Sequence, residues 1–467
     1  MRMLPVSAQD RIEKDSLGEV SVAATALWGA QTQRALENFR IGPAMMPARL
    51  VRAIGLVKWA AAETNGELGE LPVPLAAAIA GAALEVAEGN HAGQFPLGVM
   101  QTGSGTSTHM NVNEVVARLA GARIGESVHP NDHVNRCQSS NDVVPTAIHV
   151  AAALAVRDDL LPALARLATA IDERADAAGN QVKTGRTHLM DALPVTVAQE
   201  MRAWRSQVGD AAARIEAARG RLNRLALGGT AVGTGVNAHP EFASRAIARL
   251  AARTGIAFVA APDRLAAMAG QDAAVELSAT LRGAAVVLLK VANDLRWMNS
   301  GPLAGLGEIS LPVLQPGSSI MPAKVNPVIP EAVAMAATQV MAHDVAVGMA
   351  GASGNFQLNV MLPLIAHALD ESLGLVADSA NALAERAIPG LVVNAARISA
   401  SLARNPILLT ALAPRIGYDR AARIAKRAAA ESRPIIEIAA EETGLPREEL
   451  ARLLDPARLA RAQVPES

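Results

Sequence analysis

The sequence is poor in aromatic residues, which make up 2% of its 467 positions. Strands favour aromatic and β-branched residues, whereas helices favour alanine and leucine, which are abundant here. The composition therefore predicts an all-α fold. A chain of this length exceeds one compact core, so two or three subdomains are expected.

Cysteine and excess charge are nearly absent as well. The chain has one cysteine, Cys137, and a formal net charge of −1. A single cysteine excludes an internal disulfide and any metal site built from several cysteines, and it fits a reducing compartment. Without a basic excess to neutralise phosphates, we expect no nucleic-acid partner.

Long apolar runs are also missing. No segment approaches the ~18 uninterrupted apolar residues typical of a membrane span, and the longest candidate, Leu71–Leu84, contains two prolines. The stretch Met1–Glu19 is charged and lacks an apolar core, so no signal peptide is expected. We therefore expect a cytoplasmic protein with no membrane partner.

Helical periodicity dominates what is present. Residues 1–138 alternate short helical patterns with loops, residues 139–395 carry long helical patterns, and residues 396–467 have short helices broken by prolines. We expect these three segments to form an N-terminal, a central and a C-terminal domain. Helical spacing of apolar residues is clearest in Asp272–Ser300 and recurs in 195–227, 328–349 and 360–385. Such helices, apolar on more than one side, predict a bundle built from several subunits.

The segment 317–327 is the most informative part of the chain. It combines the hydroxyls of Ser318 and Ser319, the cation of Lys324 and the amide of Asn326 between two long helical patterns. An ordered loop of this length is usually functional. We interpret it as the catalytic loop of a lyase that acts on a small dicarboxylate.

Three further polar segments are each expected to open a helix. They are 102–107, 129–132 together with 139–142, and 185–188, the last lying just ahead of a helix near Pro194. Helix N-termini present unpaired N–H groups and partial positive charge, so several that converge would bind carboxylates without a metal. Each segment alone is typical of an ordinary turn or cap, but four in one chain favour a common site.

With these motifs, the chain resembles the fumarase/aspartase superfamily, and within it the class II fumarate hydratases. The resemblance runs from Arg11 nearly to the C-terminus, through 27–34, 101–106, 129–132, 227–235 and 317–327. It implies a three-domain all-α fold with a central helical bundle, and a homotetramer whose active sites are each shared by three subunits. The implied activity is the reversible, metal-free hydration of fumarate to malate, a tricarboxylic acid cycle step, through a carbanion (aci-carboxylate) intermediate and without a cofactor.

The resemblance also implies roles for individual residues. Ser318 would be the catalytic base, His188, oriented by Glu331, would handle the water, and Lys324 would act with them. The implied substrate contacts are Ser104, Thr106, Ser139, Ser140, Asn141, Thr187, Ser319, Lys324 and Asn326. A second dicarboxylate site would consist of His129, Asn131 and Asp132, and no metal ligands are implied.

The chemistry agrees with these roles. A carbanion next to a carboxylate needs preorganised donors and a cation, which Lys324, Asn326 and backbone N–H groups would supply. Histidine titrates near neutral pH, so His188 can exchange a proton with water. A serine hydroxyl is a weak base unless its alkoxide is stabilised, and the sequence does not show how Ser318 would achieve this.

Several positions depart from the hydratase pattern and leave alternatives open. Ala323, Met190 and His109 stand where Gly, Gln and Asn are usual, and 328–331 is closer to aspartases. In contrast, 139–142, 351–356 and His129 favour the hydratases. The alternatives are an aspartate ammonia-lyase, or a related lyase that releases fumarate from a substituted succinate, and a helical assembly that has lost activity.

Overall fold

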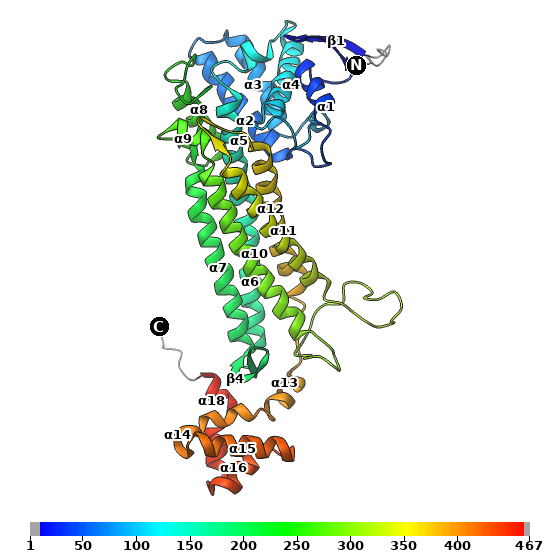
Figure 1. Ribbon diagram of the computed structural model, residues 1–467, viewed down its shortest axis with the longest axis vertical. Coiled ribbons are helices and arrows are strands. Elements are labelled where there is room, and N and C mark those ends of the chain that lie inside the picture. Colours follow the sequence, from blue (N-terminus) through cyan, green and yellow to red (C-terminus); the bar gives the residue numbers. More distant parts are fainter. Residues whose placement is uncertain (1–9, 462–467) are drawn as a thin grey trace. The chain divides into compact units, whose positions relative to one another are not determined.

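The computed structural model describes residues 10–461, and its fold is all-α, as the composition predicts (Figure 1). Within those residues strands pair only in twos. Two compact units are present: unit 1 comprises Met1–Pro162, Ala212–Ala285 and Ala337–Ala377, and unit 2 comprises Ala163–Ala211, Val286–Ala336 and Asp378–Ser467. The division into domains near residues 138 and 395 stays a prediction. The expectation that the chain has no signal peptide concerned Met1–Glu19, of which residues 1–9 lie outside the described range.

The helices and strands have the following bounds. The α-helices are α1 Ala30–Asn38, α2 Ala48–Glu67, α3 Val73–Ala87, α4 Thr106–Ile124, α5 Ser140–Ala155, α6 Leu161–Ala178, α7 Val197–Leu222, α8 Phe242–Thr254, α9 Arg264–Ala269, α10 Asp272–Met298, α11 Val328–Gly351, α12 Leu362–Ala382, α13 Ala395–Leu402, α14 Ala413–Ile416, α15 Tyr418–Glu431, α16 Ile435–Thr443, α17 Arg447–Leu453 and α18 Pro456–Arg461. The strands are β1 Asp10–Asp15, β2 Gly18–Ala23, β3 Val182–Thr187, β4 Met190–Thr196, β5 Arg224–Leu225, β6 Val259–Ala260, β7 Ile309–Ser310, β8 Gly354–Asn355, β9 Leu358–Asn359 and β10 Val392–Val393.

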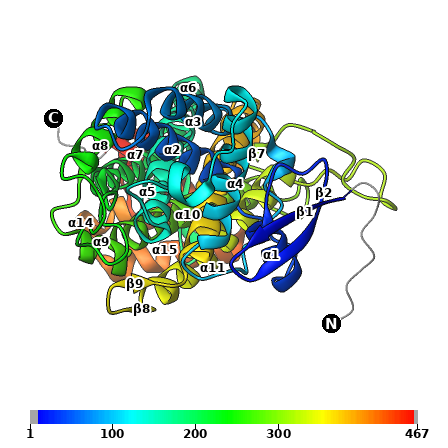
Figure 2. The same ribbon diagram turned by 90° about the horizontal axis from the view of Figure 1, so that it is seen from above.

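Unit 1 is built around α2, which packs against α3, α5 and α8. Ile54 of α2, Ile79 of α3 and Val115 of α4 are fully buried in its core. The antiparallel pair β1–β2 lies beside α1 (Figure 2). This packing holds the N-termini of α4 and α5, where two of the polar segments lie.

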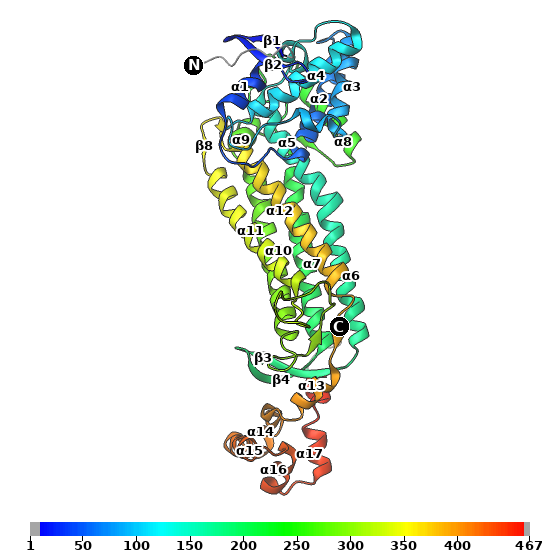
Figure 3. The same ribbon diagram turned by 90° about the vertical axis from the view of Figure 1, so that its right-hand side faces the viewer.

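Unit 2 contains a small C-terminal core made by short helices (Figure 3). Leu412, Ile424, Ile438 and Leu450 are fully buried in this core. The prolines that break the helical pattern in the sequence have a defined use, since Pro434 directly precedes α16 and Pro446 directly precedes α17. Proline is compatible with a helix start because the N–H it lacks would be unpaired there.

The long helices match the apolar periodicity closely. The pattern in Asp272–Ser300 becomes α10, which ends at Met298, and the pattern in 328–349 becomes α11, which ends at Gly351. Partly buried polar contacts join the long helices. In unit 1 the Ser278 hydroxyl of α10 donates to Asp344 of α11 at 2.8 Å, and in unit 2 the Trp204 indole of α7 donates to Asp294 of α10 at 2.9 Å.

One sequence prediction is wrong. The segment 185–188 does not open a helix near Pro194, because residues 182–196 form the antiparallel hairpin β3–β4 and α7 begins at Val197. The segment is rich in β-branched valine and threonine, which favour strands. The two-residue turn places His188 and Leu189 at φ of 54° and 60°, which is a left-handed conformation. Such turns are normally recognised in a sequence by glycine or asparagine, and this turn contains neither.

Candidate active site

The predicted catalytic loop 317–327, in unit 2, closes on itself. The backbone N–H of Gly317 donates to the Lys324 carbonyl at 2.9 Å, and the Asn326 side chain donates to the Gly317 carbonyl at 2.7 Å. A Cβ atom at position 317 would lie 2.3 Å from the Lys324 oxygen, so only glycine fits this closure. The two ends of the loop are therefore fixed next to each other.

Ser318 receives two backbone hydrogen bonds inside this loop. Its Oγ accepts from the N–H of Ile320 at 3.3 Å and from the N–H of Met321 at 2.9 Å. Backbone donors aimed at a hydroxyl oxygen stabilise negative charge that develops on it. These two backbone N–H groups would therefore help to stabilise a serine alkoxide. The sequence alone does not show such donors.

Three of the predicted residues line one cavity. Lys324, Asn326 and Glu331 border a space of about 690 Å³ in unit 2, together with Arg296 and Asn299 of the preceding segments. The ammonium and amide groups make this space suitable for an anion. Ser319 and Lys324 are exposed, and Ser318 is half-buried.

The β3–β4 hairpin carries Thr187 and His188 at its exposed tip (Figure 3). Thr187 pairs with Met190 in the two strands, so His188 and Leu189 form the turn between them. His188 has a positive φ in this turn. Among residues 10–461, no hydrogen bond or ion pair joins His188 to Glu331. The predicted orientation of His188 by Glu331 is therefore not made by direct contact in the single chain.

A buried group of charges anchors that hairpin. Lys183 of β3 is 1% exposed and lies 2.7 Å from both Glu200 and Glu308, while Arg186 donates to Glu308 at 2.6 Å. Burial alone would raise the pKa of Glu308, but Arg186 and Lys183 outweigh it and hold the pKa below its ordinary value. The carboxylate is thus charged and ties the hairpin to the segment before β7.

In unit 1, Ser139 and Asp142 form a capping box at the start of α5. The Ser139 hydroxyl accepts from Asn141 N–H, and Asp142 accepts from the Ser139 N–H at 2.9 Å. The second oxygen of Asp142 accepts from the N–H groups of Gly228 and Thr230 at 2.9 and 3.0 Å. One buried carboxylate therefore joins the 139–142 turn to the 227–235 motif, and burial raises its pKa to about 6 against these donors.

The 102–107 turn lies next to the start of α5. Ser104 is buried and its Oγ lies 2.7 Å from the Oγ1 of Thr106, the first residue of α4. A Cβ on Gly105 would meet Val144 of α5 at 2.9 Å, so the two helix starts approach closely. The structure therefore brings Ser104, Thr106 and the turn at Ser139, Ser140 and Asn141 together within unit 1.

The predicted second site occupies a π-helical turn, Pro130–Val134. His129 accepts through Nδ1 from the Asp132 N–H at 3.1 Å. His129 and Asn131 line a cavity of about 860 Å³ that Lys14 and Arg118 also border. Asn131 and Asp132 also line a smaller cavity of about 340 Å³, in which Ser139 takes part. The three residues are neighbours, and one face of their turn adjoins the Ser139 turn.

Two buried ionisable side chains in unit 1, Lys58 and Glu114, were not predicted from the sequence. Lys58 of α2 donates to Asn135 at 3.0 Å and to Gln138 at 2.9 Å, and burial lowers its pKa well below the usual value. A lysine within a mainly apolar helix gives no signal that it is buried, whereas here it fixes the segment that leads to Ser139. The second charge is Glu114.

Glu114 of α4 completes the start of α1. Its carboxylate accepts from the N–H groups of Gly29 and Gln31, both at 2.9 Å, and from the N–H and hydroxyl of Thr32 at 3.2 and 2.6 Å. Burial raises the pKa of Glu114 in spite of these donors. The motif 27–34 is thereby held against α4, the helix that Thr106 begins.

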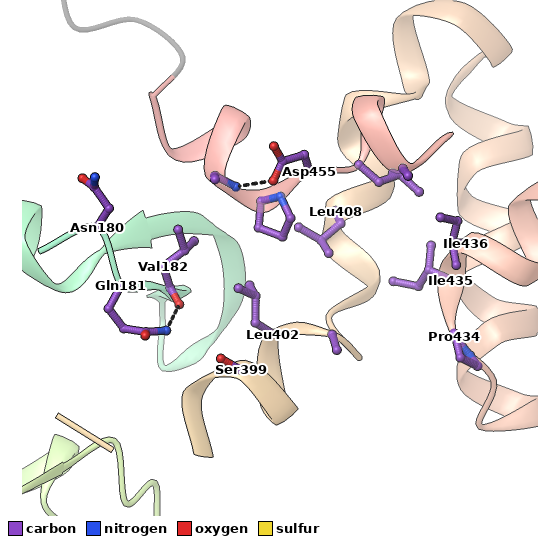
Figure 4. A pocket seen from close by; sticks show the side chains of 15 residues that line it. Asn180, Gln181, Val182, Ser399, Leu402, Leu408, Pro434, Ile435, Ile436 and Asp455 are labelled. Atoms are coloured by element: carbon purple, nitrogen blue, oxygen red, sulfur yellow. Dashed lines mark hydrogen bonds between the residues drawn. The ribbon is translucent and has the colours of Figure 1, made fainter. Parts of the chain in front are cut away.

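A separate pocket of about 720 Å³ lies in unit 2, near the C-terminal helices (Figure 4). Leu402, Leu408, Ile435 and Ile436 line it, and none of the predicted site residues does. Its mostly apolar wall offers no cation for a dicarboxylate. Within residues 10–461, no group of three His, Cys, Asp or Glu side chains is arranged to hold a metal ion.

Comparisons with known proteins agree on one family. Residues 18–342 match the model of the Lyase family, and residues 408–461 match the model described as Fumarase C C-terminus. The chain is 57% identical to a class II fumarate hydratase of Xylella fastidiosa, covering 97% of this chain and 96% of the relative. It is 48% identical to the class II fumarate hydratase of Thermus thermophilus, covering 97% and 98%.

Solved structures show the same relationship. The class II fumarase of Schistosoma mansoni superposes with a TM-score of 0.95 at 36% identity, covering 97% of this chain and all of that one. The fumarate lyase:delta crystallin of Brucella melitensis, bound to cobalt, superposes with a TM-score of 0.92 at 42% identity, covering 97% and 99%. The match thus extends over nearly the whole chain in both sequence and fold.

Proposed function

The chain belongs to the class II fumarate hydratase family of lyases, and we propose that it catalyses the reversible hydration of fumarate to malate. The observation that carries this proposal is the closed loop 317–327. In it, backbone N–H groups are directed at the Ser318 hydroxyl, while Lys324 and Asn326 line an adjoining cavity. A base next to an anion-binding cavity is the arrangement that the reaction requires.

In the direction from malate to fumarate, Ser318 removes the proton from the carbon next to a carboxylate. The electron pair left on that carbon delocalises into the carboxylate, which then carries two negative charges. Lys324 and Asn326 stabilise that charge, since a cation and a fixed donor act most strongly on charge that develops in the transition state. The N–H groups of Ile320 and Met321 support Ser318 as a base by stabilising its alkoxide.

His188 acts on the departing hydroxyl. It donates a proton to hydroxide as water leaves, and in hydration it accepts one from the attacking water. Glu331 fixes the orientation of the imidazole. Because these two side chains make no direct contact within residues 10–461 of one chain, the pairing requires another subunit or an intervening water.

The helix starts of unit 1 hold the substrate carboxylates. Partial positive charge at the N-termini of α4 and α5 attracts anions, and the nearby hydroxyls and amide orient them. These contacts come from Ser104, Thr106, Ser139, Ser140 and Asn141, with Thr187, Ser319 and Asn326 from unit 2. His129, Asn131 and Asp132 form a second dicarboxylate site.

We propose a homotetramer in which three subunits complete each active site. Support comes from α11, which is long and apolar enough by length and composition to cross a membrane, yet is only 28% buried over its most apolar window. Met335, Val345 and Met349 on α11 are 70%, 62% and 71% exposed. An exposed apolar helix of this kind is explained by contact with other subunits. A cytoplasmic location is proposed from the free, buried Cys137.

Mixing two inactive variants tests the shared site. Ser318→Ala and His188→Asn are purified separately, unfolded, mixed in equal amounts and refolded. If the two residues of a site come from different subunits, about one quarter of the sites regain both residues, and activity returns to that level. Activity that stays absent in the mixture, while refolded native enzyme recovers fully, would place both residues on one subunit.

The substrate assignment is tested by following fumarate formed from malate and, separately, from aspartate. We expect fumarate from malate alone. We also expect Ser318→Ala to lower kcat at least about 10²-fold with the fold intact, because general base catalysis contributes that much. Fumarate from aspartate alone would identify an ammonia-lyase, and a near-native rate for Ser318→Ala would disprove its role as the base.

A further inference from the structure

His109 is a buried residue of α4 that contacts the first residue of α5. Its ring is 0% exposed, and Nδ1 lies 2.7 Å from the Oγ of Ser140. The mechanism proposed above does not use this imidazole, although it touches a proposed substrate contact.

The imidazole is neutral near pH 7. Burial lowers the pKa of His109 well below its usual value, and the nearby ammonium of Lys58 lowers it further. A neutral imidazole carries a single N–H, so either Nδ1 donates to Ser140 or Ser140 donates to Nδ1. The two cases leave the serine hydroxyl hydrogen in different places.

The surroundings of the other ring nitrogen decide between them. The Nε2 of His109 is buried and has no hydrogen-bond partner among residues 10–461. A hydrogen on Nε2 would be an orphaned buried N–H, which is rarer in proteins than an acceptor without a partner. The hydrogen therefore belongs on Nδ1, which has the Ser140 oxygen as its acceptor.

This tautomer determines what Ser140 can do. When Nδ1–H donates to Oγ, the single hydroxyl hydrogen of Ser140 stays available for another acceptor. Ser140 is half-buried at the N-terminus of α5, where partial positive charge attracts an anion. The opposite tautomer would use that hydrogen internally and direct a serine lone pair at the anion.

We infer that His109 is a positioning residue that donates from Nδ1 to Ser140 and so keeps the Ser140 hydroxyl hydrogen directed at a substrate carboxylate. The inference rests on the proposed function, in which Ser140 contacts the substrate. Asparagine can replace this donor because its side-chain nitrogen lies close to where the imidazole places Nδ1. Leucine cannot, and glutamine extends its nitrogen toward the Nε2 position instead.

The test compares His109→Asn with His109→Leu in the hydration of fumarate. We expect His109→Leu to raise KM about tenfold with a smaller change in kcat, because a hydrogen bond to a charged carboxylate is weakened. His109→Asn should keep KM within about threefold of native. The thermal midpoint of His109→Leu should not fall, since leucine removes the unpaired Nε2, whereas a purely structural role predicts a lower midpoint and a native KM.

A double-mutant cycle with Ser140→Ala separates the inference from other effects. In the Ser140→Ala background, His109→Leu should leave KM unchanged. A native KM for His109→Leu in an active enzyme, or an equal rise in KM with and without Ser140, overturns the inference alone. If His109→Leu does not fold, His109→Gln takes its place with the same expected KM. A native chain that does not hydrate fumarate overturns the proposed function and the inference together.

Discussion

Replacing Gly103 with alanine tests how tightly the 102–107 turn is held. Gly103 precedes Ser104 and lies against the segment that leads into α12, where its carbonyl accepts from the Leu362 N–H at 2.9 Å. A Cβ atom at this position would lie 1.8 Å from the Val360 carbonyl oxygen and 2.7 Å from its carbon. The contact is with backbone, so no side-chain rotation can relieve it.

The magnitude follows from these distances. Non-bonded atoms settle near 3.5 Å, so the added Cβ and the Val360 oxygen must move apart by about 1.7 Å. The lost hydrogen bond and the overpacking together destabilise the fold by about 2–4 kcal/mol. Because we propose that this turn binds substrate, a displacement of this size should lower the catalytic rate about 10²-fold.

The assay is the loss of the ultraviolet absorbance of fumarate during hydration, paired with urea unfolding at fixed protein concentration. The matched control is Gly220→Ala on α7, an exposed site with no atom within 4 Å of the added Cβ. That control should keep the native rate and gain up to about 1 kcal/mol in unfolding free energy. A Gly103→Ala enzyme with native rate and stability would refute the close approach of the two segments.

Three further changes have defined outcomes. His149 contacts the Arg224 carbonyl at 2.9 Å, and burial lowers the pKa of its imidazole. The stability that the neutral imidazole contributes is therefore fully present above the unfolded pKa of about 6.5 and is lost as the pH falls through the folded pKa. Unfolding free energies measured from neutral to acidic pH should therefore fall about 1.4 kcal/mol per pH unit more steeply in native enzyme than in His149→Asn, and equal slopes would contradict this. Glu308→Gln removes the ion pair to Arg186 and leaves the buried Lys183 paired with Glu200 alone. It should cost about 2–3 kcal/mol in urea unfolding, with reduced hydration of fumarate; native stability would show that the ion pairs of Glu308 contribute little. Ala323 has φ of 66°, so Ala323→Gly should raise the unfolding free energy by about 1 kcal/mol with activity kept, and a lower value would contradict left-handed strain.

The helical fold was largely predictable from the sequence. The apolar spacing in 272–300 located α10 to within two residues, because burial of a continuous stripe repeats at each helical turn. The β3–β4 hairpin was missed because its turn uses His188 and Leu189 in a left-handed conformation, without the glycine or asparagine that normally signals it. The hairpin is also short, so its residues change the amino-acid composition of the chain too little to indicate strands.

The candidate site was only partly predictable. Ser318, Lys324 and Asn326 stand in a polar loop that contrasts with its helical surroundings, so the sequence exposes them. Lys58 does not stand out, since its importance depends on burial and on partners far along the chain. Asp142 lies in the 139–142 motif, but its contacts with Gly228 and Thr230 depend on the fold. In the proposed tetramer, the position of His188 relative to Ser318 would depend on how the subunits meet, which local sequence patterns do not encode.

The carboxylate of Glu114 has a consequence for the order of folding. Gly29, the residue before α1, has no side chain to cap the helix, and its N–H is satisfied by an oxygen that lies 85 residues later in the chain. A nascent polypeptide leaving the ribosome therefore reaches position 114 before its first helix can be completed. The start of α1 therefore gains its full set of hydrogen bonds only when α4 is in place, and local opening of α4 would release α1 as well.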